Sequence, residues 1–135
     1  MKAQEVMSRP VLTLRPHTPV SAAAAMLVSH GFTAAPVVTA EGDLLGVVTE
    51  ADLVRGHGVP LDGAPGDVPE PTVSSVMVVG PSCLSPDEEL EDVAEHMLAT
   101  GARAVLIADR GRLRGIVTQR DVLRLIAGQG PGVRR

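Results

Sequence analysis

Two threonine–aspartate pairs with the same spacing are the side chains of this sequence best placed to do chemistry. The pattern Gly-x-x-Thr-x-x-Asp supplies Thr49 and Asp52 at one position and Thr118 and Asp121 at another. Threonine three residues before an acid is typical of a capping box, in which each side chain hydrogen-bonds the other's backbone at a helix start. By itself the pattern therefore indicates only where a helix begins. Its recurrence, each time after a glycine and two apolar residues, favours a binding role as well.

Other reactive residue types are not arranged for catalysis or metal binding. The four histidines show no His-x-x-x-His spacing, and none pairs with the single cysteine, Cys83, so a metal site is not expected. No serine, cysteine or histidine lies in a recognisable nucleophile setting, and a glycine-rich phosphate loop is absent. Cys83 is interpreted as a small core residue. We therefore expect a protein that is not an enzyme and that requires no cofactor.

The two pairs belong to two copies of one longer pattern. A shift of 70 positions places Val6-Met7 on Val76-Met77, and after a one-residue deletion a shift of 69 aligns the two Thr-x-x-Asp segments. A repeated unit that cannot cover its own apolar face is expected to pack against its twin. The sequence therefore predicts one pseudo-symmetric body with two equivalent clefts.

Hydrophobic periodicity predicts the order strand, helix, strand, strand, helix in each copy. In the first copy, we expect a strand over 11–14, a helix from an N-cap at Thr18 to Gly31, strands over 35–38 and 44–48, and a helix after Thr49. In the second, we expect a strand around Cys83, a helix from a capping box at Ser85–Glu88 to Gly101, strands over 104–108 and 113–117, and a helix from Gln119 to about Ala127.

Glycine and proline mark the domain boundaries. The stretch between the copies is rich in both residue types and has no period, which is typical of a linker. We predict repeat 1 over residues 4–56, a linker over 57–72, repeat 2 over 73–128 and a flexible tail over 129–135.

The composition indicates a cytoplasmic protein with an aliphatic core. Of the 135 residues, 44% are hydrophobic, Phe32 is the one Phe, Tyr or Trp, and the net charge is −4. An acidic chain without ring platforms for base stacking is a poor candidate for binding nucleic acid. No charged leader precedes an apolar run, and no apolar stretch reaches the about 18 residues of a membrane span. We expect neither a nucleic acid nor a membrane as a partner.

These features together resemble a tandem pair of CBS domains, regulatory modules named after cystathionine β-synthase. The resemblance rests on Val6-Met7 and Val76-Met77, on Gly31–Val37, and on the two Gly-x-x-Thr-x-x-Asp segments, and it covers nearly the whole chain. It implies an α/β (α+β) fold of two β-α-β-β-α repeats packed about a pseudo-twofold axis as one CBS-pair module. Clefts between the sheets of such modules commonly take AMP, ADP, ATP or S-adenosylmethionine. Relatives also pair as dimers, so a homodimer is expected.

The resemblance assigns roles to the two pairs. A carboxylate three residues into a helix can accept both vicinal hydroxyls of a ribose, which makes Asp52 and Asp121 the expected ribose ligands. Thr49 and Thr118 would bond a ribose or phosphate oxygen, and the free N–H groups of each helix start suit a phosphate.

The two copies differ where a phosphate would lie. Arg103 stands at the position of Thr33 in the first copy, and relatives often place a phosphate-binding basic residue there. Arg120 is a second candidate, although a residue at its helix position can equally face solvent. The alternative for each arginine is a solvated or dimer-facing charge. Leu106 replaces the proline that is typical of the family, Pro36 in the first copy.

The sequence therefore leads to the hypothesis of a stand-alone regulatory CBS pair. An adenine nucleotide or S-adenosylmethionine would bind as a regulatory ligand and stabilise one arrangement of the two copies, which a regulated protein partner would sense. The alternative is a structural or oligomerising CBS pair whose clefts are vestigial.

Overall fold

The computed structural model describes residues 1–10, 12–57, 69–81 and 83–129. These residues form two compact units. One consists of residues 12–57 and 69–81, and the other of residues 1–10 and 83–129. We call them the repeat 1 unit and the repeat 2 unit, after the Thr-x-x-Asp pair that each contains. Most of the expected linker and tail lies outside the described residues.

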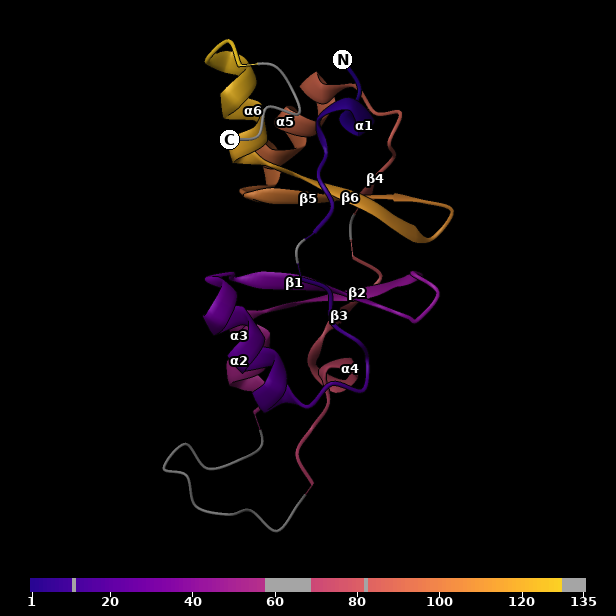
Figure 1. The fold of residues 1–135 in the computed structure, drawn as a ribbon, viewed down its shortest axis with the longest axis vertical. Coiled ribbons are helices and arrows are strands. Elements are labelled where there is room, and N and C mark those ends of the chain that lie inside the picture. Colours follow the sequence, from indigo (N-terminus) through magenta and orange to yellow (C-terminus); the bar gives the residue numbers. More distant parts are fainter. Residues whose placement is uncertain (11, 58–68, 82, 130–135) are drawn as a thin grey trace. The chain divides into compact units, whose positions relative to one another are not determined.

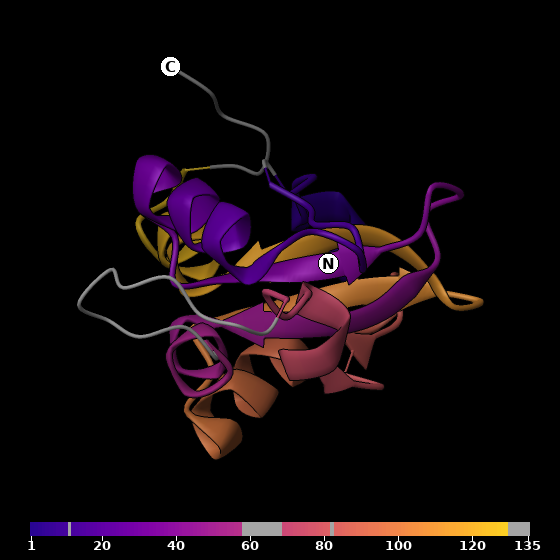
Figure 2. The same ribbon diagram turned by 90° about the horizontal axis from the view of Figure 1, so that it is seen from below.

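The repeat 1 unit is a three-stranded sheet covered on one face by helices. Its elements are α2 (Val20–His30), β1 (Ala34–Val38), β2 (Leu44–Thr49), α3 (Glu50–Arg55), α4 (Val73–Val76) and β3 (Val78–Val79). The strand order is β1-β2-β3 with both pairs antiparallel. Figure 1 shows α2, α3 and α4 on the same face of this sheet. Figures 1 and 2 place the β1–β2 hairpin at the opposite end of the sheet from α2 and α3, so the strand end that leads into α3 is separate from the hairpin.

The repeat 2 unit is also a three-stranded sheet with helices, but its third strand differs from that of the repeat 1 unit. Its elements are α1 (Ala3–Val6), β4 (Cys83–Leu84), α5 (Leu90–Thr100), β5 (Ala104–Asp109), β6 (Arg112–Thr118) and α6 (Gln119–Ile126). The sheet order is β4-β5-β6, with β4 parallel and β6 antiparallel to β5. The two units have separate aliphatic cores, built around Leu14, Val37 and Val48 in one and around Val93 and Ile107 in the other. The expected mixed α/β (α+β) class with two repeats is confirmed.

Glycine ends both long helices as the sequence predicts. Gly31 has φ +68° after α2, and Gly101 has φ +74° after α5. Such left-handed backbone is readily adopted by glycine, because it has no Cβ to clash with the following carbonyl. The β1, β2, β5 and β6 strands also agree with the expected ranges to within one residue at each end.

The first expected strand is much reduced. Val11 lies outside the described residues, and Leu14 makes only an isolated parallel bridge to Val37. The chain turns immediately afterwards, with Thr18 N–H donating to the carbonyl of Arg15. Pro16 begins this turn, which ends the pairing after one bridge. The repeat 1 unit thus keeps the predicted β-α-β-β-α order with its first strand reduced to one residue.

Both long helices start later than predicted. Helix α2 begins at Val20 with Pro19 at its N-cap, and α5 begins at Leu90 with Glu89 at its N-cap. The capping box expected at Ser85–Glu88 is wrong, because Ser85 Oγ accepts from Asp87 N–H within a turn that precedes the helix. The carboxylate of Glu70, distant in sequence, accepts from the Ser21 amide in the first turn of α2. Hydrogen bonds from the hydroxyl and amide of Ser21 hold the pKa of Glu70 below its ordinary value.

Cys83 is exposed, which corrects its interpretation as a core residue. Side chains alternate between the two faces of a strand. In the short strand β4, Leu84 packs against the core of the unit and Cys83 therefore points away from it.

Each Val-Met segment packs in the unit formed mainly by the other copy of the sequence pattern. Val6-Met7, which opens the first copy, lies in the repeat 2 unit, and Val76-Met77, which opens the second copy, lies in the repeat 1 unit. The N-terminal helix α1 lies in the repeat 2 unit, where the amides of Ala3 and Gln4 donate to the carbonyls of Glu88 (2.8 Å) and Pro86 (3.1 Å). Ser8 then bridges to Ile116 of β6. The two copies of the sequence pattern therefore exchange their opening segments.

The matching segment of the second copy does the same in the repeat 1 unit. The amides of Val73 and Ser74 in α4 donate to the carbonyls of Thr18 (2.8 Å) and Pro16 (3.0 Å). These four residues lie 70 positions from the residues that make the corresponding bonds of α1. Strand β3 then pairs with β2, with Val78 opposite Val47. The hydrophobic periodicity of the sequence does not predict this exchange. The apolar pattern of a four-residue helix is compatible with packing on either unit.

Candidate functional site

A reciprocal pair of hydrogen bonds joins the threonine and aspartate at the start of α3. Thr49 N–H donates to Asp52 Oδ2 at 2.9 Å, and Asp52 N–H donates to Thr49 Oγ1 at 3.2 Å. At the start of α6, Thr118 and Asp121 form the same two bonds at the same distances, and the Thr118 hydroxyl adds a third at 3.0 Å. The capping boxes expected from the sequence are confirmed in both units.

The two carboxylates are buried and their free oxygens are also engaged. Asp52 is 4% exposed and Asp121 is 7% exposed. An arginine one turn further along each helix donates to Oδ1, Arg55 at 2.6 Å and Arg124 at 2.8 Å. These charge-assisted bonds fix the orientation of each carboxylate. Because a carboxylate oxygen carries two lone pairs, each oxygen of Asp52 and the Oδ1 of Asp121 can still accept a further hydroxyl donor. The Oδ2 of Asp121 already accepts from both the amide and the hydroxyl of Thr118.

A backbone contact brings Arg103 beside the repeat 2 pair. The carbonyl of Arg103 accepts from the first amide of α6, Gln119 N–H, at 2.9 Å, and Ala104 pairs with Thr118 across the β5–β6 ladder. The Arg103 side chain is exposed and has no ion pair with any residue that the structure describes. It is therefore free to meet a ligand. At the matched position in repeat 1, the carbonyl of Thr33 accepts from Glu50 N–H at 2.9 Å.

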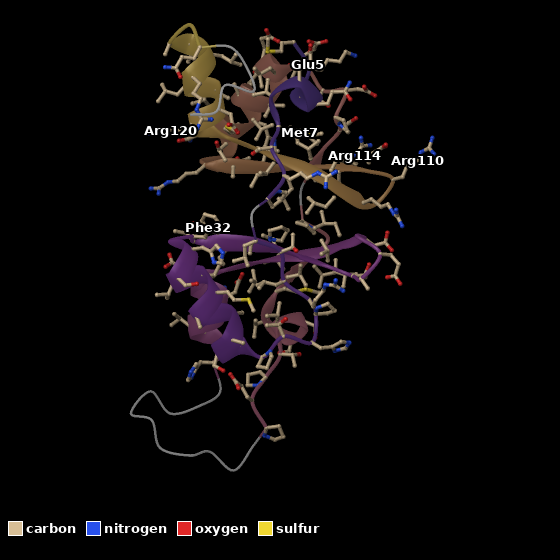
Figure 3. The ribbon with its side chains drawn as sticks, in the orientation of Figure 1. Glu5, Met7, Phe32, Arg110, Arg114 and Arg120 are labelled. Atoms are coloured by element: carbon tan, nitrogen blue, oxygen red, sulfur yellow. The ribbon has the colours of Figure 1, made fainter. Side chains whose placement is uncertain are left out.

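Arg120 is less closely tied to the pair. It is exposed on the second residue of α6, and no contact within the described ranges holds its guanidinium. Figure 3 shows Arg120 at the start of α6 and Arg110 at the tip of the β5–β6 hairpin, at opposite ends of the sheet. Arg103 and Arg120 are thus the arginines near the Thr118–Asp121 pair that have no ion pair among the described residues, whereas Arg124 is paired with Asp121. Arg110 lies at the other end of the sheet.

No group of three or more metal-binding side chains occurs in the part of the chain that the structure describes. Within the same ranges, every helix is too short or too polar to cross a bilayer. What the geometry offers is thus a set of oriented acceptors, with exposed arginines beside the repeat 2 pair, and it suits recognition of hydroxyl-bearing small molecules.

Both repeats match the CBS domain model, over residues 3–57 and 73–128. The chain belongs to the CBS domain family. Among solved structures, CBSX2 from Arabidopsis thaliana in complex with AMP is 27% identical, with a TM-score of 0.78 over 94% of this chain and 96% of that one. The CBS domain pair of protein MJ0100 in complex with methylthioadenosine and S-adenosyl-L-methionine is 26% identical, with a TM-score of 0.72 over 95% and 97% of the two chains. The chain is therefore a tandem CBS pair.

Curated relatives contain CBS-pair-like sequence within longer proteins. MJ1225 of Methanocaldococcus jannaschii, an uncharacterized protein, is 28% identical over 91% of this chain and 42% of its own length. Inosine-5'-monophosphate dehydrogenase of the same organism is 30% identical over 91% of this chain and 23% of its own length. The CBS pair thus spans less than half of these relatives.

Sequence reasoning missed Arg55 and Arg124 in this CBS pair. Each arginine stands three residues after its aspartate, and this repeated spacing could have predicted the two ion pairs. Helical residues three apart lie on the same face, so an arginine there reaches back to the carboxylate. The roles of Thr49, Asp52, Thr118, Asp121, Arg103 and Arg120 in ligand binding stay predictions.

Proposed function

We propose that this CBS pair is a regulatory module that binds adenosine-containing ligands, such as AMP, ADP, ATP or S-adenosylmethionine. The observation that carries the proposal is the buried aspartate of each unit, held in one orientation by its threonine and arginine. Two related CBS pairs were solved with AMP or with methylthioadenosine and S-adenosyl-L-methionine, which supports ligands of the same class here.

The proposed chemistry is recognition of a ribose diol. Asp52 would accept the two vicinal hydroxyls through the remaining lone pair on each of its oxygens. At the repeat 2 site, one ribose hydroxyl would bond Asp121 Oδ1 and the other would replace the Thr118 hydroxyl on Oδ2. The hydroxyls of Thr49 and Thr118 are proposed to bond a ribose or phosphate oxygen. Burial strengthens such bonds, because water competes less well for a carboxylate that is almost fully covered. This proposal needs no reacting group on the protein, so we infer a non-catalytic role. We also propose that the protein acts in the cytoplasm.

Arg103 is proposed to bind the phosphate at the repeat 2 site. Replacing Arg103 with alanine should weaken AMP binding by about 1.5–3 kcal/mol, the range for a hydrogen bond to a charged group. The wild-type affinity should also fall as salt is added, because the guanidinium is exposed to screening. Isothermal titration calorimetry measures both effects. Arg110→Ala, at the hairpin tip, is the matched control and should bind AMP as the parent does.

The proposed regulation is a population shift. A ligand that binds one arrangement of the CBS pair more tightly stabilises that arrangement, and a protein partner can distinguish it from the others. The alternative, an oligomerising CBS pair with vestigial sites, predicts that AMP, ADP, ATP and S-adenosylmethionine all leave the melting temperature unchanged. A ligand-dependent rise in that temperature would favour the regulatory module.

We also propose that the CBS pair forms a homodimer through its paired helices. Exposed apolar side chains occupy matched positions: Val28 on α2 and Leu98 on α5 are 82% and 83% exposed, and Val54 and Leu123 on the following helices are 71% and 53% exposed. Single exposed apolar residues are common, but a set repeated at matched positions in both units supports an interaction surface.

Multi-angle light scattering tests the dimer. We expect twice the mass of the chain for the wild type and a monomer for the double variant Val28→Glu with Leu98→Glu, because charges would be buried at the interface. Val79→Glu, on the edge strand β3 and 73% exposed, is the control that should remain dimeric. A wild-type monomer at micromolar concentration would contradict the dimer.

A further inference from the structure

The repeat 1 site carries the one Phe, Tyr or Trp ring in the chain. Phe32 precedes Thr33, whose carbonyl bonds the first amide of α3, so its backbone lies beside the Thr49–Asp52 pair. The residue is 36% exposed and is not part of the aliphatic core of its unit. Figure 3 shows Phe32 at the end of β1 that lies beside α3. An aromatic side chain outside the core at this position is available to a ligand.

A second ring holds Phe32 in place. His30 stacks on it with ring centroids 5.5 Å apart and an angle of 29° between the planes. His30 is itself fixed, since its Nδ1 lies 2.8 Å from the carbonyl oxygen of Met26 in the preceding turn of α2. A ring supported on one face loses little conformational entropy when a third ring stacks on it. The pair therefore forms a pre-organised platform for a flat ligand.

The repeat 2 site has the opposite character. Ala102 stands at the position of Phe32, and Arg103 stands at the position of Thr33. Repeat 1 thus offers a ring where repeat 2 has a methyl group, and a neutral hydroxyl where repeat 2 has a cation. The nearest arginine on α3, Arg55, is already paired with Asp52 at 2.6 Å, and Glu50 on the same helix is exposed and acidic.

We propose that Phe32 stacks on the base of the ligand at the repeat 1 site and makes this site selective for adenine nucleosides that lack a phosphate. Stacking on a ring binds any base through its flat face and requires no charge. A neutral or cationic adenosine derivative keeps this contact, whereas a phosphate would lie near Glu50 without a free arginine. This inference rests on the proposed function and adds a division of specificity between the two sites.

Nuclear magnetic resonance of the ring tests the inference directly. With no Tyr or Trp in the chain, the aromatic proton signals come from Phe32 and four histidines only. On titration with adenosine we expect the Phe32 ring protons to shift upfield and to saturate at the dissociation constant measured by calorimetry. This readout uses the wild-type chain, so it does not depend on the folding of a variant.

Two variants give the complementary result. Phe32→Leu should weaken adenosine binding about fivefold or more, the lower end of the range for base stacking on a ring. Ala102→Phe should strengthen adenosine binding at the repeat 2 site. Calorimetric binding of adenosine with unmoved Phe32 signals, or with unchanged affinity in Phe32→Leu, would overturn the inference while leaving the proposed function intact. An absence of heat with adenosine, AMP and S-adenosylmethionine alike would overturn both.

Discussion

Replacing Asp121 with alanine is expected to abolish ligand binding at the repeat 2 site and to lower the free energy of unfolding by about 1–3 kcal/mol. The carboxylate accepts hydrogen bonds from the amide and hydroxyl of Thr118 and from Arg124, so the variant loses a helix cap and an ion pair together. The ribose hydroxyls would also face an apolar methyl group. Urea denaturation and calorimetry with AMP measure the two losses separately.

Two further variants distinguish the structural role of Asp121 from its binding role. Arg124→Met removes only the ion pair, whose arginine is 38% exposed, and should cost about 0–1 kcal/mol of stability while AMP still binds. Asp121→Glu keeps a carboxyl group for the capping box but displaces it by one methylene. If Asp121→Glu binds AMP as tightly as the parent does, the Thr118–Asp121 pair is only a helix cap.

The second large effect is expected from Gly46→Ala, which should destabilise the protein by about 3 kcal/mol, at the upper end of the range for overpacking. A Cβ at this position would lie 2.5 Å from the carbonyl oxygen of Val78 and 2.9 Å from Met77 Sδ. Because Val78 belongs to β3, its backbone must move away from β2. The opening segment of the second copy would then lose its place in the repeat 1 sheet.

Gly115→Ala is the matched variant in the other unit and should cost less, about 1 kcal/mol. The three atoms nearest to its Cβ all belong to the flexible side chain of Met7, with Sδ at 2.7 Å and Cγ at 2.9 Å. Figure 3 places Met7 between α1 and β6. In double-mutant cycles, Met7→Ala should relieve Gly115→Ala, whereas Met77→Ala should not relieve Gly46→Ala, because the Val78 carbonyl remains. Equal costs for the two glycine variants would contradict this account of the exchanged segments.

Much of this CBS pair could be predicted from local patterns. The Thr-x-x-Asp boxes and the glycines at 31 and 101 depend on interactions within one turn of backbone, which the neighbouring residues determine. The same logic failed at Ser85, where a turn competes with the helix for the serine hydroxyl. Local hydrogen bonding alone does not decide between those two outcomes.

Long-range features were not predictable in the same way. The exchange of α1 and α4 depends on which body each segment meets, and both bodies have the same apolar pattern. The cap that Glu70 provides to α2 joins residues 49 positions apart. Within the candidate site, the aspartates and threonines followed from a repeated motif, whereas the ring at Phe32 breaks the repeat and became informative only once its position beside α3 was known.

The most direct test of the central claim is calorimetric titration of AMP and S-adenosylmethionine into the wild-type chain and into the double variant Asp52→Asn with Asp121→Asn. Asparagine keeps the size of each side chain and one acceptor oxygen, so circular dichroism should show the variant folded. We predict saturable binding of at least one of these ligands to the wild type and none to the folded variant. Equal binding by both proteins, or no binding to the wild type, would contradict a ligand-sensing CBS pair built on these two aspartates.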